Sequence, residues 1–563
     1  STDNIAGVHG IGIKTAAELI NEYGDLDTLL GKAEEIKQPK RRENLINYAD
    51  LARISMKLVT LSKDIKEIES FNNFKRRDID INKLKTFLIK QGFNSLIGRL
   101  PNEDGFIDSK SAYVALPEDN DKEDIKPIKK NNYKLVTDEQ VLVTWLKNIE
   151  INGIVSIDTE TTSIDAVSAQ LVGISLSIEP GNAIYIPLNH KSKEGGLIAD
   201  KINQLDTNLV LSLLKPILED PSIIKIGQNI KYDMTVLYNA GDINIYPYHD
   251  TMLMSFALDA GKQSGHGMDS LSKKHLNITP ISYSEITGKG KDQVTFDYVA
   301  LEKALEYAAQ DADITLRLYI FLKDRLVKEN MVSLYETIER PLPNVIAYME
   351  RNGVGINSNY LKNLSNTFIN KMNPIKEKIF NLADEEFNIS SPKQLAEILY
   401  NKLGLKGGKK GKSGLYSTSA AVLEKLSQDG NEICQLILEW RALQKLKSTY
   451  SDALVDQINP VTKRVHTHFQ MTGAMTGRFS SSNPNLQNIP IKTEDGRAIR
   501  RAFIAEENKK IVACDYSQIE LRLLAEVANI EPLIKAFKNN VDVHTLTASQ
   551  VFIVDKENVT SAM

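Results

Sequence analysis

Apolar and polar positions follow two kinds of pattern along the chain, and each predicts a different kind of element. Short apolar runs bounded by polar or glycine residues are typical of buried strands. Such runs occupy residues 153–157, 170–176 and 511–514. Longer segments with apolar positions three or four residues apart predict helices. They cover residues 360–380, 418–450, the stretch around 307–311, and the start of a further helix at Ile519, Leu521, Leu523 and Leu524.

The pattern changes near residue 100 and indicates a modular chain. Residues 1–100 are helical in pattern, with basic runs at 40–42 and 75–77. Residues 101–132 are rich in Asp, Glu and Lys with little periodicity, as expected of a linker. A length of 563 residues suits about three or four domains. No internal repeat of about 20 to 50 residues indicates a solenoid.

Composition narrows the class of protein. No run of about 18 apolar residues predicts a membrane span. Cys434 and Cys514 are far apart, so we expect neither a disulfide framework nor a zinc ribbon, and a cytoplasmic location fits. The formal net charge of -4 does not exclude binding to nucleic acid, because affinity for phosphates depends on where the cations cluster.

Four acidic residues and one tyrosine form the strongest candidate chemistry. Asp158 and Glu160 lie two apart in a predicted strand, so both carboxylates project from one face. Tyr307 and Asp311 lie four apart in a helical segment, one turn apart on one surface. Together with Asp233 they can bind two cations about 4 Å apart and activate a water for attack on a phosphodiester. One Asp-x-Glu pair is weak evidence, so the prediction rests on the ordered set.

A second candidate carboxylate, Asp515, follows the apolar run 511–514. At the end of a strand it can hold Mg²⁺ against a triphosphate. An isolated Asp at a step from strand to helix is more often a helix cap. The motifs at 476–481, which include Arg478, and at 485–490 favour the catalytic interpretation.

Two further segments carry weaker signals for DNA binding. In the first, Gly10 and Gly12 precede Lys14, and glycines before a helix start allow backbone amides to bind a phosphate, although an ordinary turn has the same pattern. In the second, four lysines alternate with glycines, and this run is either a basic tip for DNA or a solvated loop. Its lysines are Lys406, Lys409, Lys410 and Lys412. A further basic group, expected to contact DNA, comprises Lys463, Arg464, Arg497, Arg500 and Arg501.

These motifs resemble family A DNA polymerases over essentially the whole chain. The resemblance implies a multi-domain fold with a helical helix-hairpin-helix module, an α/β ribonuclease H-like 3′-5′ exonuclease domain, and an incomplete α+β polymerase domain with a helical thumb and part of the palm. The expected boundaries are 1–100 for the C-terminal part of a 5′ nuclease domain, 101–132 for a linker, 133–323 for the exonuclease and 324–563 for the polymerase part. Within that last part the thumb covers about 360–450 and the partial palm 451–563.

The resemblance also implies residue roles. In the exonuclease, Asp158, Glu160, Asp233 and Asp311 would hold two Mg²⁺ or Mn²⁺ ions and Tyr307 would orient the attacking water. In the polymerase, Asp515 would bind metal, Gln518, Glu520 and His544 would contact the incoming dNTP, and Arg478, Asn485 and Gln487 would contact DNA. An isolated His is more often structural, so the role of His544 is the weakest of these. Asp3 matches a metal ligand of the 5′ nuclease.

The implied activity is DNA-directed DNA synthesis in replication and repair, with proofreading, and in a longer parent a 5′-3′ exonuclease. The expected partners are primer-template duplex and single-stranded 3′ ends, bound by a monomer. The family's later motif with a second catalytic aspartate does not follow residue 544, so we expect no polymerisation by this chain. The alternative is a non-catalytic DNA-binding module with vestigial sites.

Overall fold

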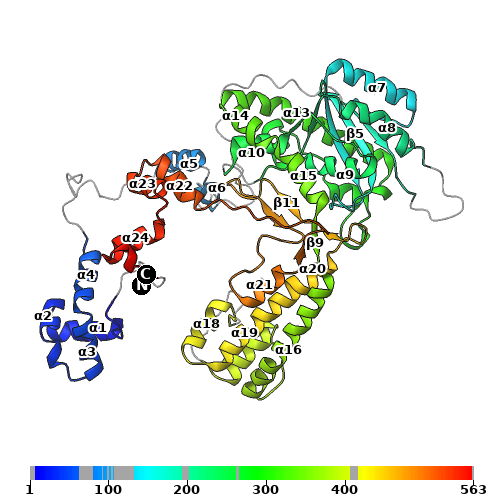
Figure 1. Ribbon diagram of the computed structural model, residues 1–563. Coiled ribbons are helices and arrows are strands. Elements are labelled where there is room, and N and C mark those ends of the chain that lie inside the picture. The colour runs from blue at the N-terminus through cyan, green and yellow to red at the C-terminus, as the bar shows by residue number, and fades with distance from the viewer. Residues whose placement is uncertain are drawn as a thin grey trace. The chain divides into compact units, whose positions relative to one another are not determined.

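The computed structural model describes residues 7–61, 80–91, 93–97, 100–102, 105–106, 132–192, 202–261, 265–405 and 416–560. The chain divides into two compact units, Ser1–Asp121 and Lys122–Met563, and each is described separately (Figure 1). Asp3 and the four lysines of the 406–412 run lie outside the described residues, so the predictions made for them stay predictions.

Up to residue 100 the first unit is helical where it is described, as its sequence pattern predicts. Its core contains Leu19, Leu29, Leu30 and Leu45, each from the apolar side of an amphipathic helix. The helices are α1 Ile13–Tyr23, α2 Leu26–Gly31, α3 Pro39–Asn47, α4 Ala49–Val59, α5 Ile81–Lys90 and α6 Asn94–Ile97. The expected linker begins with two short paired strands, β1 Pro101–Asn102 and β2 Gly105–Phe106.

A six-stranded mixed sheet organises the first half of the second unit, in the order β3-β6-β5-β4-β7-β8. The central strand β4 pairs antiparallel with β5 and parallel with β7. Both predicted strands at 153–157 and 170–176 are confirmed, because β4 and β5 cover them. The bounds are β3 Asn132–Leu135, β4 Ile154–Thr161, β5 Leu171–Glu179, β6 Asn182–Pro187, β7 Ile224–Gly227 and β8 Tyr248–Asp250.

Helices cover both faces of this sheet. Val155 and Ile157 of β4 belong to one core with α7 Glu139–Asn152, α8 Thr207–Leu218 and α9 Lys231–Gly241. The opposite face packs against α13 Leu301–Lys328, and Val172 and Tyr185 join Ala304 and Ala308 of that helix in a second cluster. The alternation of β4 therefore sends its apolar residues to one layer and Asp158 and Glu160 to the other. The remaining helices here are α10 Thr251–Asp259, α11 Met268–Leu271, α12 Tyr283–Thr287, α14 Val332–Leu334 and α15 Leu342–Asn352.

The expected thumb forms a helical bundle around Leu361, Phe368, Ile437 and Trp440 (Figure 1). The predicted helix over 360–380 is confirmed within α16 Ser358–Ala383. The helical pattern over 418–450 is confirmed, and the structure divides it because Gly430 at φ 94° separates α18 from α19. The bounds are α17 Pro392–Ala396, α18 Ala420–Gln428, α19 Glu432–Leu446 and α20 Ala453–Asp456.

Short strands precede and follow the bundle in the chain. β9 Val354–Ile356 pairs antiparallel with β10 Arg464–Val465 and β13 Phe503–Ile504, and β11 His468–Gln470 pairs with β12 Ser480–Ser482. The helices that follow are α21 Glu494–Arg500, α22 Ile519–Val527, α23 Glu531–Lys538 and α24 Val543–Phe552. The predicted helix start at Ile519 is confirmed.

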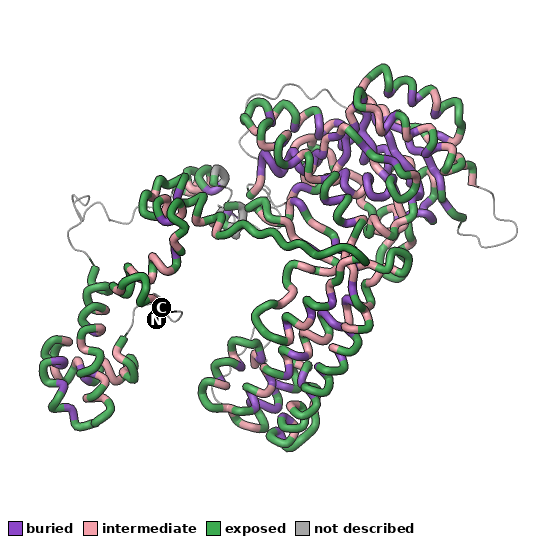
Figure 2. The backbone as a smooth tube through the Cα atoms, viewed as in Figure 1, coloured by how far each residue is buried: buried purple, intermediate pink, exposed green. Residues whose placement is uncertain are grey.

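The predicted buried strand at 511–514 is wrong. These residues have no regular secondary structure, and they lie in an exposed stretch before α22 (Figure 2). Ile511 and Val512 are 62% and 80% exposed. A strand needs hydrogen-bonding neighbours and a covered face, and among the described residues no strand pairs with this segment.

None of the described helices is both long enough and apolar enough to cross a bilayer.

Candidate active site

Three of the predicted metal ligands converge between β4 and α13. Asp158, Glu160 and Asp311 each place a carboxylate oxygen within 4.8 Å of the others. Asp158 is half-buried, and Glu160 and Asp311 are buried. The i, i+2 spacing on β4 and the single turn from Tyr307 to Asp311 on α13 bring the side chains together, because α13 packs against the face of the sheet from which Asp158 and Glu160 project.

Asp233 lies in the first turn of α9 and faces the same strand. Its Oδ1 accepts hydrogen bonds from the Thr159 amide at 2.9 Å and the Thr159 hydroxyl at 2.6 Å. Thr159 sits between Asp158 and Glu160 on β4, so this contact ties α9 to the carboxylate-bearing strand. Asp233 is not in the three-residue cluster; burial raises its pKa, and the charge of the Asp158 carboxylate adds to the rise.

The turn before α9 is fixed by another buried carboxylate. Asp250 accepts hydrogen bonds from the amides of Asn229 and Ile230, both at 3.1 Å. Burial raises the pKa of Asp250 to about 6, and these backbone hydrogen bonds oppose that rise. Asn229 takes a φ of 57°, a conformation that Asn tolerates better than most residues. Asp250 thereby sets where α9 begins.

Like charge and burial dominate the electrostatics of the cluster. Burial is the main cause that raises the pKa of the Asp158, Glu160 and Asp233 carboxyls well above their usual range, and repulsion between the carboxylates adds to it. Burial likewise raises the pKa of Asp311, while its hydrogen bond with the Tyr307 hydroxyl lowers it. Buried carboxylates grouped in this way are typical of functional sites rather than of stabilising networks.

The cluster fits divalent cations. Oε1 of Glu160 is buried and has no hydrogen-bond partner among the described residues. A buried carboxylate oxygen without a partner is costly unless a cation meets it, and hard carboxylate oxygens are the ligands that Mg²⁺ and Mn²⁺ prefer. Asp158, Glu160 and Asp311 would hold such ions, with Asp233 beside them.

Aromatic rings surround Tyr307. Its ring lies 6.0 Å from Phe296 and 6.3 Å from Tyr283, between centroids. Burial, reinforced by the Asp311, Glu160 and Asp158 carboxylates, raises the pKa of the Tyr307 phenol, so it keeps its proton and can donate a hydrogen bond. A group that orients a water molecule needs such a position and a proton to donate, and Tyr307 has both.

Sequence reasoning missed a second tyrosine at the cluster. Burial and then the charges of Glu160 and Asp158 raise the pKa of Tyr185, which lies wholly buried on β6. His190 Nδ1 lies 3.1 Å from the Val299 carbonyl and donates to it, so the Tyr185 hydroxyl donates to His190 Nε2 at 2.7 Å. Gly173 leaves room for the ring, because a Cβ there would lie 2.1 Å from the Tyr185 oxygen. No local sequence motif marks Tyr185 as a neighbour of the carboxylates, because its position depends on pairing between strands.

The predicted polymerase residues lie on exposed segments. Asp515 is exposed and belongs to no carboxylate cluster within the described part of the chain. Arg478 and Glu520 form an ion pair at 3.0 Å, with both side chains more than two-thirds exposed. Gln518 begins α22 at φ 55°, and its side chain hydrogen-bonds to Asp542. Asp542 also caps α24 by accepting from the amide of His544 at 3.2 Å.

The other predicted DNA contacts have mainly local partners. Gln487 accepts from the Ser481 amide at 3.2 Å and donates to the Phe479 carbonyl at 3.0 Å, while Asn485 accepts from the Gln487 amide. In the first unit Gly10 takes φ 74° in the turn before α1, Gly12 caps that helix, and Lys14 is exposed on it. These residues are accessible to DNA, and their binding roles stay predictions.

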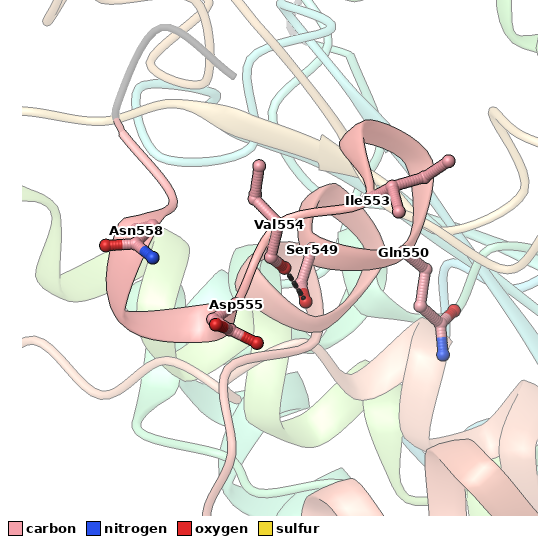
Figure 3. Close-up of a pocket in the computed structure, with 6 residues that line it drawn as sticks. All are labelled: Ser549, Gln550, Ile553, Val554, Asp555 and Asn558. Carbon is pink, nitrogen blue, oxygen red and sulfur yellow. Dashed lines mark hydrogen bonds between the residues drawn. The ribbon is translucent and has the colours of Figure 1, made fainter.

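A surface pocket elsewhere contains none of the predicted site residues. It lies at the end of α24, where the Ser549 hydroxyl donates to the Val554 carbonyl at 2.6 Å (Figure 3). Its lining comprises Ser549, Gln550, Ile553, Val554, Asp555 and Asn558. A lone Asp among amides and apolar side chains offers no catalytic group comparable to the buried cluster.

Comparison with known proteins assigns families to three stretches of the chain. Residues 358–563 match the model of DNA polymerase family A, residues 133–327 match a 3′-5′ exonuclease, and residues 1–82 match a 5′-3′ exonuclease, C-terminal SAM fold. These matches define a multi-domain protein that joins nuclease and polymerase modules, which confirms the predicted fold class. Over residues 358–563 the chain is therefore similar to DNA polymerase family A.

Individual proteins show the same likeness. The chain is 42% identical to the DNA polymerase I of Rhizobium leguminosarum and 39% identical to that of Pseudomonas aeruginosa, over 99% of its own length in both cases. It spans 61% and 60% of the length of these relatives. A solved structure, the POL domain of Pol1 from M. smegmatis in complex with DNA primer-template and dNTP, superposes with a TM-score of 0.62 at 27% identity. That likeness covers 76% of this chain and 69% of the other.

Proposed function

We propose that this chain is a metal-dependent 3′-5′ exonuclease that removes nucleotides from single-stranded DNA ends, within a DNA-directed DNA polymerase of replication and repair. The carboxylate cluster carries the proposal: three acids within 4.8 Å, one with a buried oxygen that has no partner among the described residues. The match of residues 133–327 to a 3′-5′ exonuclease supports it independently.

The residues of the cluster and their neighbours have different proposed roles in the reaction. Asp158, Glu160 and Asp311, with Asp233, would hold two Mg²⁺ or Mn²⁺ ions. When bound, such ions lower the pKa of water and stabilise the attacking and leaving oxygens of a phosphodiester. Tyr307, protonated and hydrogen-bonded to Asp311, orients the attacking water. Thr159 holds Asp233 in register with β4.

The test is product length on labelled single-stranded DNA with Mg²⁺. Asp158→Ala should abolish shortening by the 563-residue chain, because the change removes a cluster carboxylate. Asp324→Ala is the matched control, since Asp324 is an exposed acid on the same helix as Asp311 and should leave the rate unchanged. Equal shortening by wild type and Asp158→Ala would contradict the proposal.

Polymerisation is a second candidate function, supported by the match of residues 358–563. Asp515, Gln518, Glu520 and His544 would form the nucleotide site, and Arg478 would contact the primer terminus. Two-metal transfer needs two anchoring carboxylates, and within the described residues Asp515 stands apart from any carboxylate cluster. We therefore expect no extension of a primer by this chain, and template-dependent extension would contradict that expectation.

The implied partners are primer-template duplex and single-stranded 3′ ends, each bound by one copy of the chain. The solved structure of the similar POL domain supports duplex binding, because that domain is in complex with a DNA primer-template. A non-catalytic DNA-binding module is the remaining alternative. DNA binding that is independent of Mg²⁺, with no nucleotide released, would favour it. A cytoplasmic location stays a prediction from the two separated cysteines.

A further inference from the structure

The first turn of α9 is held from two sides. Asp233 faces β4, where Thr159 donates two hydrogen bonds to it. Lys231, two residues earlier, faces the other way, because a helix turns about 200° over two residues. This lysine is almost completely buried, with 1% of its side chain exposed.

Lys231 meets two elements outside the exonuclease sheet. Its Nζ donates to Oε1 of Glu350 on α15 at 2.5 Å and to the Phe469 carbonyl on β11 at 2.7 Å. The same Glu350 oxygen accepts from the Phe469 amide at 2.6 Å, and its side chain is 6% exposed. One buried ion pair thus joins α9, α15 and β11.

The neighbouring contacts fix Glu350 in place. The Glu350 backbone carbonyl accepts from His466 Nδ1 at 2.7 Å. On the same helix, the Arg351 guanidinium lies 3.7 Å from the centre of the Tyr238 ring of α9. Helix α15 therefore packs along α9 and presents Glu350 to Lys231.

Stability alone is a poor explanation for this pair. A buried ion pair is often no more stabilising than apolar residues of the same volume, whereas the pair does specify one arrangement of its elements. Lys225 on β7 offers a contrast within the same domain. It is also fully buried, but its Nζ donates to the carbonyls of Asp220, Ile223 and Tyr246, all within the exonuclease domain.

We propose that Lys231 is a positioning residue for Asp233, and that through Glu350 and Phe469 it makes the geometry of the exonuclease metal site depend on strand β11 of the polymerase part. The inference rests on the proposed exonuclease function. β11 pairs with β12, which begins two residues after Arg478 in the chain, so the strand pair next to the predicted primer contact also supports the helix that carries Asp233.

The test measures binding of Mn²⁺ to the full chain by electron paramagnetic resonance, without DNA. The part of the binding that Asp158→Ala removes defines the exonuclease sites. Lys231→Met should raise the Kd of these sites about 10- to 100-fold, the usual effect of losing a residue that orients a metal ligand. Glu350→Gln should shift the Kd in the same direction, and the double variant should be no weaker than the worse single variant.

Lys225→Met is the matched control. It removes a buried lysine from the same domain and should lower the thermal unfolding midpoint while leaving the Kd for Mn²⁺ unchanged. Cleavage of single-stranded DNA by Lys231→Met should recover at saturating Mn²⁺, which a misfolded site would not do.

An unchanged Kd in Lys231→Met, or an equal shift in Lys225→Met, would overturn the proposal. If Lys231→Met does not fold, Glu350→Gln decides, because it keeps the shape of the side chain and lies outside the exonuclease domain. If the wild-type chain binds Mn²⁺ but does not cleave DNA, the exonuclease function fails while the Kd comparison still decides the role of Lys231.

Discussion

Among single residues, Tyr307 separates catalysis from packing most clearly. Tyr307→Phe keeps the ring between Phe296 and Tyr283 but removes the hydroxyl that hydrogen-bonds to Asp311. We expect the exonuclease rate to fall about 10- to 100-fold, as for other partners of metal ligands. The measurement is the initial rate of nucleotide release from single-stranded DNA.

A matched tyrosine provides the control for this change. The Tyr133 hydroxyl donates to Asp313 at 2.8 Å, and Asp313 lies two residues beyond Asp311 on the same helix. Tyr133→Phe therefore removes a partly buried Tyr–Asp hydrogen bond outside the cluster. It should cost stability and leave the rate unchanged. Equal rates for the two variants would contradict the assigned role of Tyr307.

The cluster also predicts how stability depends on pH. Burial raises the pKa of Asp311 to about 8 in the folded chain, above the value of about 4 expected when unfolded. The stability linked to this group is fully present below about pH 4 and is lost as the pH rises through about 8. In EDTA, the unfolding midpoint of wild type should therefore fall between about pH 5 and pH 8, and Asp311→Asn should reduce this fall.

Added metal should reverse the loss. A ligand that binds only the folded chain stabilises it by about 2.7 kcal/mol at a hundred times its Kd, so Mn²⁺ at about pH 8 should raise the midpoint of wild type more than that of Asp311→Asn. Calorimetric scans with EDTA and with Mn²⁺ test both statements. A midpoint in EDTA that changes equally with pH in the two proteins would show that Asp311 is not the group responsible.

Among elements, β5 and β6 pack closely at Gly173, where the absence of a side chain leaves room for the Tyr185 ring. A Cβ on Gly173 would lie 2.1 to 2.5 Å from three atoms of the buried Tyr185 ring. Gly173→Ala must displace that ring, and overpacking of a buried position costs about 1–3 kcal/mol. We expect a lower unfolding midpoint and a slower exonuclease. Gly267→Ala is the control, because a Cβ there meets no atom within 4 Å. A midpoint lowered equally by both changes would contradict the close packing of Gly173 against Tyr185.

Local patterns predict elements well where the element's own residues determine it. β4, β5 and α16 follow from apolar alternation and helical spacing, and the Asp158–Glu160 and Tyr307–Asp311 spacings place those side chains on shared faces. The run 511–514 has the composition of a strand but no strand alongside it within the described chain, so its backbone does not pair. The contribution of Tyr185 depends on Gly173, twelve residues away on another strand. Long-range pairing of this kind has no local signal.

In the whole molecule, the arrangement of cations matters more for DNA than their number. Three arginines expected to contact DNA donate to backbone carbonyls: Arg464 to Asn352 at 2.6 Å, Arg497 to Lys492 at 3.1 Å and Arg500 to Ile489 at 2.8 Å. Their guanidinium groups bind the backbone of loops in the polymerase part, so we expect these arginines to contribute mainly to folding stability. Lys463 is exposed and forms no ion pair with the described residues.

Because Lys463 is exposed and Arg500 is hydrogen-bonded to the backbone, we expect their substitution to have different effects: on the salt dependence of binding to primer-template DNA for Lys463, and on stability for Arg500. The slope of log K against log salt should become shallower by about 0.9 in Lys463→Gln, the value for one lost phosphate contact. Arg500→Gln should leave the slope unchanged and lower the unfolding midpoint, because it breaks hydrogen bonds to the carbonyls of Ile489 and Pro490. Fluorescence anisotropy at several salt concentrations measures the slope. A shallower slope in Arg500→Gln at an unchanged midpoint would mean that this guanidinium leaves its backbone partners to bind DNA.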